Sequence, residues 1–202
     1  LKNIKTNKKN FSNLNFKKIP NIMGVLNITP DSFSDGGKFL KPNLAKKQLE
    51  LLFKSGADLV DVGGESTRPG SKSVKSSTEW KRINKIIKRF GKTKNISLDT
   101  RKSDIMEKGI KLGVNLVNDV SGLGYDKDTI KVLKKYRTPF VLQHFIADPE
   151  VMQKNPKYKN VVLEIYDFFE KKIRFLRSSG IRHNNIILDP GIGFGKNLKH
   201  NM

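Results

Sequence analysis

The chain has 202 residues, with 40 Lys and Arg against 19 Asp and Glu, a formal net charge of +21 at pH 7. Hydrophobic residues make up 36% of it and recur at regular spacing, which excludes a disordered chain and suits one domain with a sizeable core. Cysteine is absent, which excludes disulfides and thiolate metal sites and suits a cytoplasmic protein. No apolar run approaches the roughly 20 residues that span a bilayer, so we expect no membrane partner.

The basic excess has two interpretations. It could bind nucleic acid, because Lys and Arg neutralise phosphates. However, most basic residues lie between apolar helix positions, as in KRINKIIKR (81–89) and IKVLKKYR (130–137). No stretch interleaves them with aromatic residues in the manner of a single-strand binder. We therefore expect a solvated basic surface and no nucleic-acid partner, with attraction of anionic phosphate substrates as a further consequence.

Residues 1–19 form a basic, polar segment without the apolar region of a secretory signal. We expect an N-terminal tail here and one domain over residues 20–202, since there is no repeat at fixed period and no Gly/Ser linker.

Short β-branched runs alternate with amphipathic stretches along this domain. Six runs predict strands: 21–27, 58–64, 95–100, 115–120, 139–144 and 185–191. Four stretches between them have apolar residues at helical spacing: 44–52, 80–90, 130–136 and 165–176. Ser76 with Glu79 has the pattern of a capping box, and Gly113 and Gly180 stand where helices should end.

This alternation predicts a parallel sheet covered by helices, which leaves a doubly wound sheet or a (β/α)8 TIM barrel. Almost every strand ends in polar residues: Asn27, Glu65 with Thr67, Asp99, Asn118, His144 and Asp189. Barrel enzymes gather their chemistry from the carboxyl ends of many strands, whereas doubly wound sheets concentrate it at a switch point. We therefore predict a TIM barrel of which the chain carries about the first six βα units.

Two loops carry polar residues suited to a charged substrate. NITPDSFSDGG (27–37) has the composition of a lid, or alternatively of a decorated turn. In GGESTRPGS (63–71), Thr67 and Arg68 can hold phosphate or carboxylate oxygens. Glu65 in the same loop could instead be structural and pair with a nearby Lys or Arg.

Asp99, Asn118 and Asp189 share a place at strand ends. Two carboxylates and an amide facing one pocket suit a heterocycle with alternating donors and acceptors, such as a pterin, whose 2-amino group and N3–H form a two-donor edge. A single Asp after a strand is more often a helix cap, so the shared placement is the evidence.

DPGIGFGK (189–196) is rich in glycine and ends in Lys196, but it is not a P-loop. Pro190 stands where the motif needs Gly, and Asn197 replaces the Ser or Thr that binds Mg²⁺. A substrate loop is the better interpretation, with Phe194 a candidate for contact with an aromatic ring. His144 lines a pocket or has a structural role, and these alternatives are equally open.

The segments NITPDSFSDGG, GGESTRPGS, LDTRK, NDVSG and DPGIGFGK resemble, in this order, the signature segments of the dihydropteroate synthase family. The resemblance implies a TIM barrel, a homodimer when complete, and a transferase that condenses 6-hydroxymethyl-7,8-dihydropterin diphosphate with p-aminobenzoate in folate biosynthesis. It also implies Mg²⁺ as cofactor.

The same resemblance implies roles for individual residues. Asp99, Asn118 and Asp189 are expected to bind the pterin, and Lys196 is expected to be a further substrate-binding residue. Asn27 is expected to help bind Mg²⁺ and the diphosphate, and Thr67 and Arg68 to lie beside the diphosphate and p-aminobenzoate. The pocket of the aromatic substrate is expected to be shaped by three further residues, Phe33, Pro69 and Phe194.

The sequence departs from the family pattern at two places. The fifth strand reads QHFIADPEVMQ where the family has a Met-His-Met-like run followed by Gly. A Lys at the seventh strand and an Arg-x-His at the eighth cannot be assigned within these residues. The chain alone is therefore expected to be inactive, and a non-catalytic, pterin-binding fragment or pseudoenzyme is the alternative.

Overall fold

The computed structural model describes residues 20–30, 42–66, 71–145 and 156–202. All six predicted strands are confirmed. They are β1 (Met23–Asn27), β2 (Leu59–Gly63), β3 (Ile96–Asp99), β4 (Leu116–Asp119), β5 (Phe140–Gln143) and β6 (Ile186–Asp189).

Helices alternate with these strands, and all four predicted helices are present. The helices are α1 (Pro42–Lys54), α2 (Ser76–Phe90), α3 (Ser103–Lys111), α4 (Thr129–Tyr136), α5 (Val161–Ser178) and α6 (Leu198–Asn201), with a 3-10 turn at His183–Asn185. The sequence analysis missed α3 and α6. Helix α3 has nine residues and a glycine, Gly109, so its apolar pattern is short and interrupted, and α6 has four residues.

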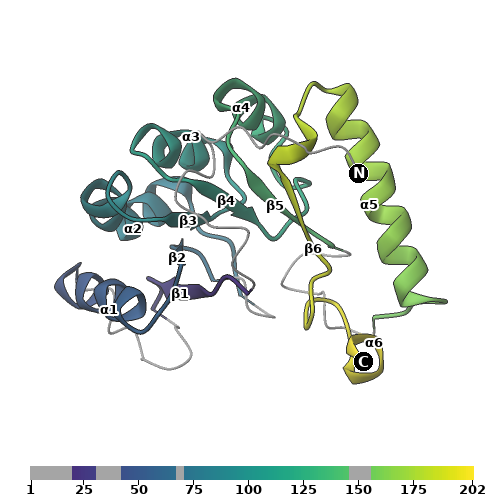
Figure 1. Ribbon diagram of the computed structural model, residues 1–202, viewed down its shortest axis with the longest axis horizontal. Helices are drawn as coiled ribbons and strands as arrows, with labels where there is room; N and C mark the ends of the chain where they lie inside the picture. Colours follow the sequence, from purple (N-terminus) through teal and green to yellow (C-terminus); the bar gives the residue numbers. More distant parts are fainter. Residues whose placement is uncertain (1–19, 31–41, 67–70, 146–155) are drawn as a thin grey trace.

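The strands form one parallel sheet in the order β1-β2-β3-β4-β5-β6, which is also their order in the chain. Figure 1 shows α1 to α4 following one another along the outer side of the curved sheet. A doubly wound sheet would reverse direction at a switch point and carry helices on both faces. The sheet described here does neither, which confirms the predicted fold class, with six βα units of a (β/α)8 barrel.

Apolar side chains fill both faces of the sheet. Alternate strand residues pack outward against the helices in two buried clusters, around Leu98 and Ile83 in one and around Phe140 and Leu133 in the other. A smaller cluster lies on the inner face and consists of Leu59, Leu116 and Val141 with Ile187. Since side chains alternate along a strand, polar residues in register with this inner cluster also point inward.

The helix boundaries were predicted in part. Gly113 and Gly180 follow α3 and α5 with positive φ angles of 98° and 89°, which confirms them as helix ends. The prediction of a capping box formed by Ser76 and Glu79 was wrong. Helix α2 begins at Ser76 after the N-cap residue Lys75, which makes no side-chain cap. Glu79 bonds to Lys102 instead, because this buried ammonium is the stronger partner.

No helix within the described ranges is long and apolar enough to cross a membrane. The expected division into a tail over 1–19 and a domain over 20–202 stays a prediction, since the tail lies outside the described residues.

Candidate functional site

A row of polar residues crosses the inner face at the carboxyl ends of the first four strands. In the parallel register, Asn27 pairs with Gly63, Gly63 with Asp99, and Asp99 with Asn118. Residues in register on adjacent strands point to the same side of a sheet. Three of the predicted site residues therefore lie side by side.

Gly63 makes room for this row. A Cβ atom at Gly63 would lie 3.0 Å from Asp99 Oδ2 and 3.2 Å from Asn27 Oδ1. The two oxygens thus converge over the one position in the row that has no side chain. Any larger residue at position 63 would push them apart.

Asp189 lies on the same face, farther along the sheet. Asn118 pairs with Val141 of β5, and Asp189 pairs with Gln143, two residues beyond Val141. The two-residue offset keeps Asp189 on the inner face, so the structure brings all three members of the Asp99, Asn118 and Asp189 trio to one side of the sheet. Phe194 and Lys196 follow in the loop after β6, where Phe194 is half-buried and Lys196 is buried.

Four predicted site residues, Phe33, Thr67, Arg68 and Pro69, lie outside the described residues, and their roles stay predictions. The two residues that flank 67–70 are tied together, because Ser71 Oγ donates to Ser66 O at 2.7 Å.

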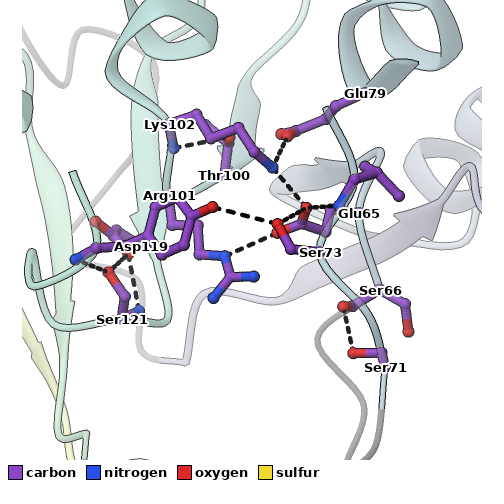
Figure 2. A network of polar contacts seen from close by, with 12 residues as sticks. Glu65, Ser66, Ser71, Ser73, Glu79, Thr100, Arg101, Lys102, Asp119 and Ser121 are labelled. Atoms are coloured by element: carbon purple, nitrogen blue, oxygen red, sulfur yellow. Dashed lines mark hydrogen bonds and ion pairs between the residues drawn. The ribbon is translucent and has the colours of Figure 1, made fainter. Parts of the chain in front are cut away.

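A buried ionic network surrounds the side chain of Glu65 (Figure 2). Glu65 accepts from Arg101 Nε at 2.8 Å and from Lys102 Nζ at 2.5 Å, and it also accepts from the backbone N–H of Val74. Lys102 Nζ donates to Glu79 Oε2 at 2.6 Å as well. The structural interpretation of Glu65 is therefore confirmed, because two basic residues after β3 hold it.

The network changes the pKa values of its members. Burial raises the pKa of Glu79, and the hydrogen bond from Lys102 only partly opposes it. Burial lowers the pKa of Lys102, but its hydrogen bonds to Glu65 and Glu79 outweigh this and raise it. The Arg101 guanidinium stacks 4.0 Å from the centre of the Tyr125 ring, which covers the network.

Asp99 carries the one carboxyl group in the row, and the pKa of this group is strongly shifted. Burial raises the pKa of Asp99 well above its ordinary value, and the neighbouring carboxylates of Asp61 and Glu79 raise it further. An anionic Asp99 is therefore destabilised until a donor or a cation approaches it. This is the electrostatic character of a site that binds a donor-rich ring.

Sequence reasoning missed Asp61, which lies in the middle of β2 and is 5% exposed. Its Oδ2 accepts from Asn118 Nδ2 at 2.9 Å, and this bond orients the amide of Asn118. Burial raises the pKa of Asp61, opposed by the Ser97 hydroxyl and by Asn118. An acidic residue inside the apolar run LVDVG, on the same face as Gly63, was the signal that could have revealed it.

Asp119, at the end of β4, gives a prediction on pH dependence. Burial raises its pKa from 3.8 to about 6, against hydrogen bonds from Ser121. A folded-state pKa above the unfolded value means that the folded chain binds more protons, so stability falls as the pH rises from about 4 to about 6. We expect Asp119→Asn to remove this loss, which amounts to about 3 kcal/mol.

The measurement is the free energy of unfolding of both chains by urea denaturation between pH 4 and pH 7. Relative to the unmodified chain, the free energy of unfolding of Asp119→Asn should increase as the pH rises from about 4 to about 6. Asp126→Asn is the control of opposite sign, because hydrogen bonds from Ser103 and Asp128 outweigh burial and lower the pKa of Asp126. A difference between Asp119→Asn and the unmodified chain that does not change with pH would contradict the prediction.

The chain can now be compared with known proteins. Residues 23–202 match the model of a protein family described as pterin binding enzyme. This match covers most of the chain, and the trio of Asp99, Asn118 and Asp189 falls within it. The chain therefore belongs to the pterin-binding enzyme family.

Relatives of the chain include dihydropteroate synthases. The chain is 44% identical over 183 residues to that of Clostridium beijerinckii, covering 90% of this chain and 65% of the relative. It is 38% identical over 184 residues to that of Escherichia coli (strain K12), with the same two coverages, 90% and 65%. The crystal structure of the Yersinia pestis dihydropteroate synthase with a sulfonamide drug complex is similar with a TM-score of 0.88 and 36% identity, covering 93% of this chain and 68% of that one. The chain thus spans about 65% of the length of these curated relatives.

Proposed function

We propose that this protein is a dihydropteroate synthase, a transferase that joins 6-hydroxymethyl-7,8-dihydropterin diphosphate to p-aminobenzoate and releases pyrophosphate in folate biosynthesis. The observation that carries the proposal is the placement of Asp99, Asn118 and Asp189 on one inner face of the sheet. Relatives that bear this name, at 44% and 38% identity, support it.

The pterin ring is the part of the substrate that this face recognises. A pterin offers N–H donors along one edge, and carboxylates accept from two such donors well. Asp99 and Asp189 supply carboxylates, and Asn118 supplies an amide whose orientation Asp61 fixes. Donation from the ring to Asp99 would also offset the cost of ionising this half-buried carboxyl group.

The residues present fit a Mg²⁺ ion held mainly by the substrate. Asn27 Oδ1 and Asp99 Oδ2 converge over Gly63, and both are oxygen donors of the kind Mg²⁺ prefers. The part of the chain that the structure describes has no group of three His, Cys, Asp or Glu side chains that could hold a metal ion. Such a site suits Mg²⁺ bound to diphosphate, with Asn27 as its protein ligand, where the cation would neutralise charge on the departing diphosphate.

The reaction needs no nucleophilic side chain. The nitrogen of p-aminobenzoate forms a bond to the exocyclic CH2 of the pterin, the C–O bond to the diphosphate breaks, and the amine loses a proton. The protein has to hold the ring, bind the leaving anion and exclude water. We assign the task of holding the pterin ring to Asp99, Asn118 and Asp189. The other two tasks belong to the loops after β1, β2 and β6, whose expected residues are Phe33, Thr67, Arg68, Pro69 and Phe194.

The proposal is tested by calorimetry on the purified chain and by a pyrophosphate-release assay on a chain extended through the seventh and eighth strands. With 6-hydroxymethyl-7,8-dihydropterin diphosphate and Mg²⁺ we expect saturable binding, and with p-aminobenzoate added to the extended chain we expect pyrophosphate release that depends on p-aminobenzoate. Binding without release would favour the alternative function, a non-catalytic pterin-binding protein. Absence of binding would reject both functions.

The homodimer implied by the family resemblance and the cytoplasmic location expected from the absence of cysteine remain predictions. Size-exclusion chromatography with light scattering would check the first, and cell fractionation the second.

A further inference from the structure

The ammonium group of Lys196 is enclosed by its own loop. The residue is 4% exposed, and its Nζ lies 3.0 Å from His144 Nδ1. The same nitrogen donates to the carbonyl oxygens of Gly191 and Phe194, each at 3.1 Å. An ammonium has three N–H donors, and these three partners use all of them. No donor of Lys196 is left over for a ligand.

His144 is the matching acceptor. Its ring is buried, 3% exposed for the residue, and packs edge-on against Phe168 with ring centres 4.9 Å apart. Burial and the adjacent Lys196 lower the pKa of His144 to about 4, so the ring is neutral near pH 7. A neutral imidazole can accept at Nδ1, as the short contact with the ammonium requires.

Gly191 links this pair to Asp189. Its N–H donates to Asp189 Oδ1 at 2.7 Å, while its carbonyl oxygen accepts from Lys196. Gly191 has a φ angle of 68°, and a Cβ there would lie 2.7 Å from His144 O, so only glycine fits. Among the described residues, the N–H of Gly191 is the one hydrogen-bond donor to the Asp189 side chain.

We propose that His144, Gly191 and Lys196 form a clamp that positions the Asp189 carboxylate, and that Lys196 acts through Asp189 without contacting the ligand. Lys196 holds the carbonyl oxygen of Gly191, and the N–H of the same residue occupies one oxygen of the Asp189 carboxylate. The other carboxylate oxygen is left for the ligand. The identity of the ligand as a pterin rests on the proposed function, whereas the clamp itself does not.

The first test needs no ligand. The titration of His144 is followed by NMR, with His144→Asn to assign its signal among the three histidines. The charged and polar neighbours of the ring are Lys196, Glu164 and Tyr158. In Lys196→Met we expect the midpoint to rise from about 4 yet stay below 6.5, because burial persists. Lys199→Met, an exposed lysine in α6, is the control and should leave the midpoint unchanged.

The second test measures the effect on Asp189. Lys196→Met is expected to weaken binding of 7,8-dihydropterin about tenfold, the equivalent of one hydrogen bond. In an Asp189→Asn background the same change should add no more than roughly twofold, because the single amide oxygen cannot be held by the Gly191 N–H and also face the ligand, so the clamp no longer presents an acceptor to it. If Lys196→Met does not fold, Lys196→Gln, which keeps two N–H donors, serves for both measurements.

The outcomes separate the two proposals. An unchanged His144 midpoint in Lys196→Met would overturn the clamp, whatever the chain binds. A full tenfold loss in both backgrounds would show that Lys196 contacts the ligand itself, and would also overturn it. A raised midpoint in a chain that binds no pterin would reject the proposed function and leave the clamp supported.

Discussion

Replacing Asp189 by alanine is expected to abolish binding of 7,8-dihydropterin, with a loss of at least about 100-fold. The carboxylate offers charge-assisted hydrogen bonds to the donor edge of the ring, each of about 1.5–3 kcal/mol. The change also removes the acceptor of the Gly191 N–H, which loosens the loop after β6. Isothermal titration calorimetry measures the affinity, and Asp189→Asn, which keeps one acceptor oxygen, should retain part of it.

Asp167→Ala is the matched control, because Asp167 is an exposed acid on α5. It should bind dihydropterin as the unmodified chain does. Equal affinities of Asp189→Ala and the unmodified chain would remove Asp189 from the pocket. Since Asp189 is one of three recognising residues, that result would weaken the whole assignment of the inner face.

Replacing Lys102 by methionine is expected to lower the free energy of unfolding by about 3–5 kcal/mol. Lys102 is paired with Glu65 and Glu79, whose side chains are 6% and 0% exposed. Methionine keeps most of the length of the side chain but leaves Glu79 without its ammonium partner in the interior. Denaturation in urea at pH 7 measures the loss.

Two further variants make the Lys102 prediction specific. Lys108→Met removes a surface pair with Asp104, in which the side chains are 46% and 45% exposed, and should cost less than about 1 kcal/mol. Adding Glu79→Gln to Lys102→Met should restore part of the stability, because the unpaired charge is gone. Equal effects of Lys102→Met and Lys108→Met would show that the buried network does not stabilise the fold.

The fold could be predicted from local patterns because each unit of this architecture has its own signal. Strands buried on both faces give short apolar runs, and the polar residues after them mark the carboxyl edge of the sheet. Helices α3 and α6 were the exceptions, since α6 has four residues and Ile105 and Met106 are the buried apolar residues of α3 beside Gly109. The parallel order follows from alternation, but the register does not, because it depends on packing between distant segments.

The site was predicted where polar residues share a place at the carboxyl ends of neighbouring strands. Asn27 and Asp99 end β1 and β3, Asn118 is the last residue but one of β4, and the structure places the three in one row. Glu79 was misassigned to a local cap because its partner, Lys102, lies 23 residues away. A local pattern cannot weigh a distant buried charge against a nearby backbone N–H, although the charge is the stronger partner.

The agreement between strand order and chain order has a consequence for biosynthesis. Each strand pairs with the strand made just before it, so every ladder closes over a single βα unit. As the polypeptide leaves the ribosome, each of β2 to β6 finds its neighbour already synthesised. Loop closure stays short at each of these steps, which keeps its entropic cost low and limits the time during which the edges between these strands are open to aggregation.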